Sequence, residues 1–266
     1  MRRLGNTIEE ATATGSAGVA YGYLGEFARA LAYADRGVQL AQESQNPFAE
    51  TAAHFYRALV HQQRGSWTPA IADCETALRI AERVKDSFRI YALTCYAGWA
   101  QAMAGDLVKG RMLLEAGIAL AEQLGTKLFL AWGKIYLAAC RLALGERTAV
   151  LPLCHEAIRL AEETHDRLAQ AVAQRTLAEA LGGLEPEEPQ AAERAMLEAI
   201  RLQQEIGAKP ELARSHVSYA RLLRGWGETA KAREYLTQAI GMFQQMDMAW
   251  DRVQAEQGLG PLLDGL

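Results

Sequence analysis

Polar and apolar residues along this chain follow the period of amphipathic helices. Within the segment 48–64, polar residues recur every three or four positions and therefore share one side of a helix. They are Glu50, His54, Arg57, His61 and Arg64. β-branched and aromatic residues never alternate over a long run, as they do in strands. The pattern predicts an all-α protein whose helices follow one another in pairs, for example 48–64 and 68–84.

Glycines recur at an interval of 40 residues, and small residues recur at fixed distances from them. The glycines are Gly25, Gly65, Gly105 and Gly145. The small residues are Gly18 and Gly37, Ala58 and Ala77, Gly98 and Gly117, Ala138 and Ala157, and, in a register shifted by two, Ala180 and Ala199, then Ala220 and Ala239. Helices that pack roughly 8–10 Å apart need small side chains where they cross. A single helix pair cannot bury its apolar side alone, so we expect the pairs to stack into a solenoid.

The spacing small–x6–Gly–x–aromatic–x2–Ala–x6–Ala resembles the tetratricopeptide repeat. In the second repeat these positions are Ala58, Gly65, Trp67, Ala70 and Ala77. The resemblance extends from about residue 8 to 245 and implies a right-handed α-solenoid of about six two-helix TPR-like repeats plus a C-terminal capping helix. The period of 40 exceeds the roughly 34 residues of the standard repeat, and it also suits HEAT-like repeats, which are the alternative fold.

The repeat boundaries follow from this register, within a single solenoid domain spanning 1–266. The expected repeats are 8–45, 46–85, 86–125, 126–165, 166–207 and 208–246, and the expected cap is 247–266. Repeats of this length, with the ending Gly241–Leu259, are similar to the C-terminal regions of MalT-like regulators and of ATPase-linked adenylate or guanylate cyclases. This resemblance implies a bacterial signalling regulator.

Composition and charge narrow the class of protein. The chain has 266 residues, of which 50% are hydrophobic and 23% charged, with a net charge of −4. A weakly acidic chain does not favour nucleic acid or an anionic membrane as partner, and no apolar run approaches the roughly 20 residues of a membrane span. The basic start Met1-Arg2-Arg3 is followed by polar residues rather than the apolar core of a signal peptide, which predicts a cytoplasmic protein.

No arrangement of residues indicates catalysis. Gly182-Gly183 lacks the Lys and Ser/Thr of a phosphate-binding loop. His54 and His61 share a helix face without an evident third metal ligand, and the neighbours Cys154 and His155 point about 100° apart on a helix. We therefore expect no enzymatic activity, no cofactor and no metal.

Cysteine and arginine positions leave alternatives open. Cys74, Cys95, Cys140 and Cys154 are scattered without CxxC spacing, so we interpret them as buried residues in a reducing cytosol, with a disulfide or metal role as the alternative. Three arginines lie on one predicted helix: Arg214, Arg221 and Arg224. We interpret them as part of a solvated face or, alternatively, as a basic strip that binds an acidic peptide.

The resemblance also implies a binding surface, because the first helix of each tetratricopeptide repeat lines the concave face. Carrying over the groove-facing positions gives an apolar, aromatic groove suited to an amphipathic helix or an extended peptide. The predicted groove residues are Tyr23, Phe55, Leu59, Trp99, Met103, Trp132, Ile135 and Leu142.

Local polarity favours a different surface on the same helices. On this interpretation the exposed strip is polar and cationic, and the aromatic residues form the core between stacked repeats. The alternative strip is His54, Arg57, His61, Lys134 and Arg141. Tyr56, Tyr96 and Tyr136 recur in one register and border either surface.

The predicted function is non-catalytic recognition of a protein or peptide, as the sensor or interaction region of a bacterial regulator. The alternative is a small-molecule (inducer) binding domain, which would need an enclosed concavity with a few convergent polar groups. We also expect that the ends of the solenoid can self-associate.

Overall fold

The computed structural model describes residues 2–183 and 189–262, and every regular element in this part of the chain is a helix. The α-helices of these residues are α1 (Arg2–Tyr23), α2 (Phe27–Ser44), α3 (Pro47–Arg64), α4 (Trp67–Arg83), α5 (Ser87–Met103), α6 (Leu107–Gln123), α7 (Leu130–Ala143), α8 (Val150–Glu163), α9 (Arg167–Leu181), α10 (Pro189–Ile206), α11 (Lys209–Gly225), α12 (Thr229–Gln245) and α13 (Ala249–Leu259). Two short 3-10 helices are η1 (Arg147–Ala149) and η2 (Gly260–Leu262). The prediction of an all-α repeat fold is confirmed.

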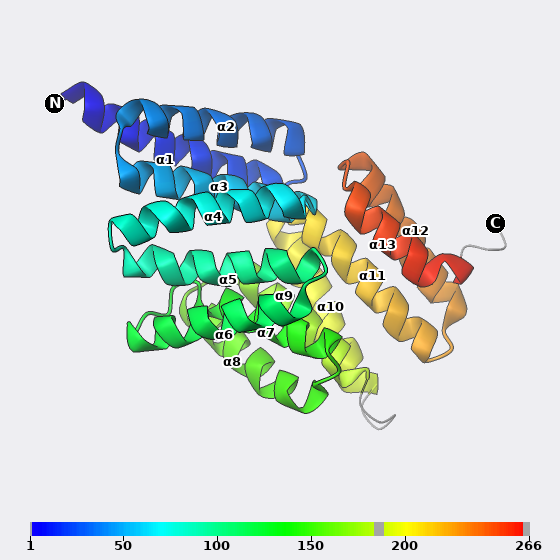
Figure 1. The fold of residues 1–266 in the computed structure, drawn as a ribbon. Coiled ribbons are helices and arrows are strands. Elements are labelled where there is room, and N and C mark those ends of the chain that lie inside the picture. Colours follow the sequence, from blue (N-terminus) through cyan, green and yellow to red (C-terminus); the bar gives the residue numbers. More distant parts are fainter. Residues whose placement is uncertain (1, 184–188, 263–266) are drawn as a thin grey trace. The chain divides into compact units, whose positions relative to one another are not determined.

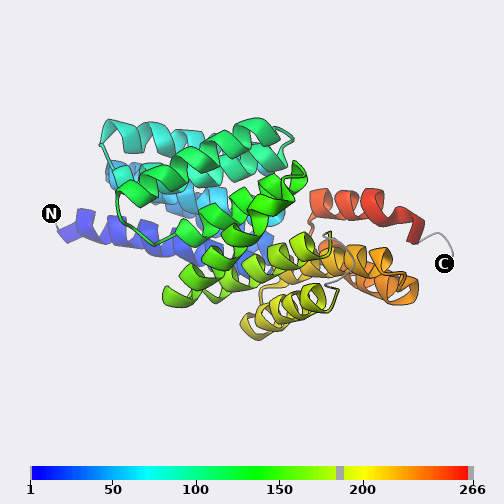
Figure 2. The same ribbon diagram turned by 90° about the horizontal axis from the view of Figure 1, so that it is seen from below.

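The chain divides into two compact units, residues 1–136 and 137–266, with the boundary inside α7. In the first unit, Figure 1 shows α5 next to α4, and each helix from α1 to α5 packs against the helix that follows it. In the second unit, Figures 1 and 2 both show α13 beside α12. Each expected repeat range contains one first helix and one second helix, for example α3 and α4 in 46–85.

The recurring glycines end first helices in the left-handed backbone conformation. Gly65 caps α3 with φ of 79°, and its N–H donates to the carbonyl of Gln62. Gly25, Gly105 and Gly145 have φ of 78°, 111° and 81°. Residues with a Cβ adopt this region at a cost of roughly 1–2 kcal/mol, which explains glycine at these turns. The predicted glycine turns are confirmed.

Side-chain caps fix the starts of the first helices that carry the candidate site. The Asn46 side chain accepts hydrogen bonds from the N–H groups of Phe48 and Ala49, at 2.9 and 3.1 Å, and so begins α3. The Asp86 carboxylate accepts a hydrogen bond from the N–H of Arg89, at 3.1 Å, and so begins α5. These caps place the first turns of α3 and α5 at defined positions.

The recurring small residues lie where helices cross. The alanines among them are fully buried, with 0% exposure: Ala58, Ala77, Ala138, Ala157, Ala180, Ala199, Ala220 and Ala239. A Cβ added to Gly98 of α5 would lie 2.9 Å from the carbonyl oxygen of Gly110 in α6, so the two backbones touch there. A Cβ added to Gly117 would lie 2.5 Å from Cys95 Sγ. Small residues therefore allow the close packing of the helix pairs.

Three further predictions concern membranes, metals and cysteines. Among the described helices, none combines the length and hydropathy that crossing a bilayer requires. Within the same residues, no group of three or more His, Cys, Asp or Glu is arranged to hold a metal ion. All four cysteines are buried.

Candidate functional site

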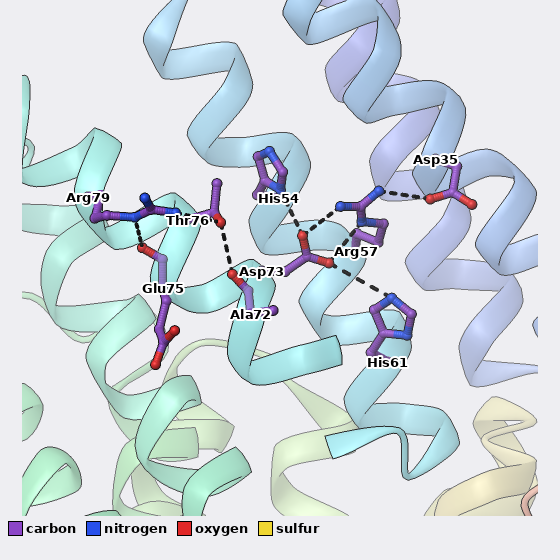
Figure 3. A network of polar contacts seen from close by, with 9 residues as sticks. All are labelled: Asp35, His54, Arg57, His61, Ala72, Asp73, Glu75, Thr76 and Arg79. Atoms are coloured by element: carbon purple, nitrogen blue, oxygen red, sulfur yellow. Dashed lines mark hydrogen bonds and ion pairs between the residues drawn. The ribbon is translucent and has the colours of Figure 1, made fainter. Parts of the chain in front are cut away.

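A buried carboxylate on α4 gathers the polar side chains of α3 (Figure 3). Asp73 Oδ1 lies 2.7 Å from His54 Nδ1, and the Arg57 guanidinium donates to both carboxylate oxygens, Nε to Oδ2 at 2.8 Å and Nη2 to Oδ1 at 2.7 Å. His61 Nε2 is 3.8 Å from Oδ2. Arg57 also donates through Nη1 to Asp35 on α2, at 2.9 Å. The network joins α2, α3 and α4.

Burial and hydrogen bonding set the charges in this network. Burial by itself raises the pKa of Asp73, but the hydrogen bonds from His54 and Arg57 outweigh it, and the pKa of this carboxyl lies below its ordinary value. Its hydrogen bond to Asp73 raises the pKa of Arg57. Burial lowers the pKa of His61. The buried carboxylate is therefore ionised and neutralised by Arg57, which is the pattern of a structural ion pair.

Replacing Asp73 with asparagine is expected to lower the free energy of unfolding by about 2 kcal/mol at pH 7, because charge-assisted hydrogen bonds to buried donors are lost. Since the pKa of Asp73 is depressed in the folded state, this stabilisation is present above the unfolded-state pKa of about 4 and disappears as the pH falls through the folded-state value. Urea denaturation of both proteins at several pH values measures the difference.

Asp35→Asn is the matched control, because Asp35 also accepts from Arg57 but its side chain is 63% exposed. We expect it to change stability by less than about 1 kcal/mol. Equal losses for the two variants would show that burial of Asp73 does not strengthen the network.

The predicted polar strip is not a continuous exposed surface. His54 and Lys134 are buried, with 8% and 5% exposure, so for these two residues the prediction of a solvent stripe is wrong. Arg57, His61 and Arg141 are half-buried. Lys134 Nζ lies 3.0 Å from Glu122 Oε1 on α6. Polar side chains that face a neighbouring helix have the same spacing as side chains that face water, which is why the sequence pattern misled.

Aromatic side chains of α3, α5 and α7 contact one another along the first unit. The rings of Phe55 and Tyr96 are 5.1 Å apart and those of Tyr96 and Tyr136 are 5.6 Å apart. Trp99 stacks on Tyr136 at 4.8 Å with an interplanar angle of 6°. Such pairs stabilise by about 0.5–1.5 kcal/mol beyond their buried area. The recurring tyrosines therefore belong to the contact between successive first helices.

The predicted groove residues differ in depth. Phe55 and Ile135 are buried, with 8% and 1% exposure, so they are mainly packing residues. The other six are half-buried: Tyr23, Leu59, Trp99, Met103, Trp132 and Leu142. Within the first unit, half-buried aromatic and methionine side chains of this kind leave apolar surface at the first helices.

An apolar pocket of about 230 Å³ opens beside Phe55 in the first unit. It lies between α3, the first turns of α5 and the connection before α7. Its lining residues are Ala52, Phe55, Tyr56, Phe88, Arg89, Ala92, Leu93, Leu128 and Phe129. Four of these nine residues are aromatic; the ring centroids of Phe55 and Phe129 are 5.8 Å apart, and those of Phe88 and Phe129 are 6.2 Å apart.

Three exposed apolar residues at the starts of successive repeats accompany this pocket, and we call them the apolar rim. Phe48, Phe88 and Leu128 are spaced 40 residues apart and are 48%, 38% and 50% exposed. Phe88 and Leu128 line the pocket. Phe48 lies beside it, because the guanidinium of the lining residue Arg89 is 5.8 Å from the Phe48 ring. The groove prediction missed these residues, although their 40-residue recurrence is visible in the sequence.

In the second unit, ion pairs join successive first helices. Arg175 Nη1 on α9 lies 2.7 Å from Glu211 Oε2 on α11, and Arg214 Nε on α11 lies 2.8 Å from Asp251 Oδ1 on α13. Arg214 also pairs with Glu211. Burial raises the pKa of Glu211, but Arg214 and Arg175 outweigh it and hold the pKa at about 2. Of the three arginines considered from the sequence, Arg214 is thus part of an internal network, while Arg221 and Arg224 are exposed.

Comparison with known proteins shows the fold. No protein-family model matches the sequence, and none of the curated proteins matches it. A Rap protein complexed with competence and sporulation factor is similar with a TM-score of 0.73 and 13% identity, over 90% of this chain and 65% of that chain. The apo form of RapI is similar with a TM-score of 0.68 and 14% identity, over 90% of this chain and 85% of that chain.

A signal transduction ATPase with numerous domains, which has a tetratricopeptide repeat sensor and comes from Pyrococcus horikoshii, is also similar. Its TM-score is 0.54 at 14% identity, over 91% of this chain and 38% of that chain. These structures confirm the prediction of a tetratricopeptide-like repeat fold. At such identities the likeness is one of fold.

Proposed function

We propose that this tetratricopeptide-like repeat protein is a non-catalytic scaffold that binds a protein or peptide at the apolar rim and pocket of its first unit. The supporting observation is the recurrence of exposed apolar residues at one repeat position, Phe48, Phe88 and Leu128. Contiguous exposed apolar surface is costly in water and typically marks an interaction site. Aromatic side chains around a pocket are typical anchors of such interfaces.

The dimensions of the pocket favour a side chain of a partner over a free small molecule. Its volume of about 230 Å³ is below the roughly 300–1,000 Å³ of most small-molecule sites. The lining is apolar apart from Arg89 and the Tyr56 hydroxyl, whereas an inducer site would gather several polar groups. An inserted apolar side chain, with the rest of the partner lying along the rim, fits these features.

A regulatory setting in the bacterial cytoplasm is part of the proposal. The structures of similar fold include Rap proteins, one of them complexed with competence and sporulation factor, and a signal transduction ATPase with a repeat sensor. In that setting the chain would bind a partner and control an attached or associated effector. The network of His54, Arg57 and Asp73 pairs its charges internally, which supports a structural role for these residues rather than a catalytic one.

Leu128→Asp is expected to weaken partner binding at least about ten-fold, because it places a charge on the wall of an apolar pocket. The probes are peptides selected from a displayed random library on the wild-type chain, and fluorescence anisotropy measures their affinity for each variant. Thermal stabilisation by a panel of small metabolites is measured in parallel.

Val108→Asp is the matched control, because Val108 is 56% exposed on α6 and does not line the pocket. It should leave peptide binding unchanged. Selected peptides that bind both variants equally well, or stabilisation by metabolites without any peptide binding, would overturn the proposal.

A further inference from the structure

Arg89 is the one charged residue among those that line the pocket. It lies in the first turn of α5, where its N–H donates to the Asp86 carboxylate at 3.1 Å. No carboxylate belongs to the lining. A cation at the mouth of an otherwise apolar pocket has a marked effect on which partner can bind, because a buried charge without a counter-ion is costly.

The Arg89 side chain is held in place while donors remain for a ligand. Nη1 pairs with the Asp86 carboxylate, and the guanidinium lies 5.8 Å from the ring of Phe48. The side chain is 33% exposed. A guanidinium has five N–H donors in a fixed planar arrangement that suits carboxylates, so one pairing with Asp86 does not exhaust it.

Cations outnumber carboxylates among the residues next to the pocket lining in sequence, in contrast to the chain as a whole. Lys85 precedes α5, and Lys127 directly precedes the lining residue Leu128; both are exposed. The carboxylates closest in sequence to the lining are Glu50 and Asp86, which are half-buried. The cations Lys85, Arg89 and Lys127 thus outnumber these two carboxylates, whereas the whole chain has a net charge of −4, and such a local excess of positive charge favours an acidic partner.

We propose that the partner is an acidic segment in which one large apolar side chain is flanked by Asp or Glu. The apolar side chain enters the pocket, the nearest carboxylate pairs with Arg89, and further carboxylates lie near Lys85 and Lys127. Arg89 in the lining, with Lys85 and Lys127 next to the lining in sequence, fits several side-chain carboxylates better than a single terminal carboxylate. This inference rests on the proposed function and specifies the chemistry of its partner.

Labelled synthetic peptides of one length test the inference by fluorescence anisotropy. With C-termini amidated, the set has Trp flanked by Asp, by Asn or by Lys, and Gly flanked by Asp. A fifth peptide ends in Trp with a free carboxylate after Asn residues. The Asp-flanked Trp peptide should bind about ten-fold more tightly than the Asn-flanked one, because only Asp can form a charge-assisted hydrogen bond with Arg89. Its affinity should fall several-fold at high salt, while that of the Asn-flanked peptide stays constant.

Arg89→Gln should reduce the preference for Asp over Asn flanks below about two-fold. Arg159→Gln is the control, because Arg159 pairs with Glu163 within one helix and lies far from the pocket in the sequence. Circular dichroism checks the fold of both variants, and the salt dependence of the wild type is an independent measurement.

Each unexpected outcome has a distinct meaning. Equal binding of Asp- and Asn-flanked Trp peptides would overturn the acidic partner and leave the proposed function standing. Tightest binding by the free-carboxylate peptide would assign Arg89 to a chain terminus and overturn the inference. Binding of no Trp peptide would overturn both proposals.

Discussion

Arg214→Met is expected to lower the free energy of unfolding by about 3–5 kcal/mol, because it leaves a buried carboxylate without its partner. Arg214 donates to Asp251 through Nε at 2.8 Å and Nη2 at 3.1 Å, and the Asp251 side chain is only 6% exposed. Burial lowers the pKa of Arg214, but Asp251 and Glu211 outweigh it, so the pKa of the guanidinium is raised. Urea denaturation followed by circular dichroism measures the loss.

Arg201→Met is the matched control, since Arg201 also pairs with two carboxylates, those of Glu198 and Glu205. Its side chain is 52% exposed, whereas that of Arg214 is 18% exposed. Water and salt screen exposed ion pairs, so the stability of this variant should remain close to that of the wild type. The same chemical change thus has a large effect only where the ion pairs are buried.

A second substitution distinguishes an unpaired charge from lost packing. If Asp251 without its partner causes the destabilisation, then adding Asp251→Leu to Arg214→Met should restore most of the stability, because an apolar pair can replace a buried ion pair. No recovery in the double variant, or a loss below about 1 kcal/mol in Arg214→Met, would contradict this account of the network.

The fold was predictable because its physical cause repeats along the chain. In five of the repeats a glycine with positive φ stands where the first helix ends, and Gly65, with φ of 79°, shows why glycine recurs there. Each helix pair also needs small residues at its crossing, and Ala58 and Ala77 have 0% exposure. Repetition of these two requirements along the chain produces a periodic signal that a single copy would not.

The depth of the first-helix residues could not be predicted from their register. The groove positions of a repeat identify Phe55 and Ile135 correctly as residues of first helices, but neighbouring helices cover them. Phe55, for example, packs on Tyr96 of the next first helix and on Phe129 of the connection before α7. Such covering depends on side chains 41 or 74 residues away in the sequence, and the pattern within one helix contains no information about it.

The polar residues of α3 show the same limit from the other direction. Their spacing of three and four places them on one side of a helix, and that much is right. The sequence of α3 does not reveal that Asp73 of α4 lies opposite His54 and Arg57, so a buried network had the appearance of a solvent stripe. The apolar rim, in contrast, was visible as a recurrence at Phe48, Phe88 and Leu128, but these residues lie at the start of a first helix or just before it, outside the groove register.

Gly110→Ala is expected to lower the free energy of unfolding by about 3 kcal/mol, because one added methyl group meets backbone atoms that cannot turn away. The new Cβ would lie 2.7 Å from the carbonyl oxygen of Gly98, 2.7 Å from the Cβ of Ala102 and 2.9 Å from the nitrogen of Ala102. Relief requires α5 and α6 to separate along their crossing, which loses packing in the first unit.

Gly241→Ala is the matched control, because Gly241 lies in α12 with no atom within 4 Å of an added Cβ. There the alanine should stabilise by about 0.5–1 kcal/mol, since glycine inside a helix has the larger entropy loss on folding. The two variants make the same chemical change and should shift the urea midpoint in opposite directions. A rise in stability for Gly110→Ala would show that the two helices do not need their close approach.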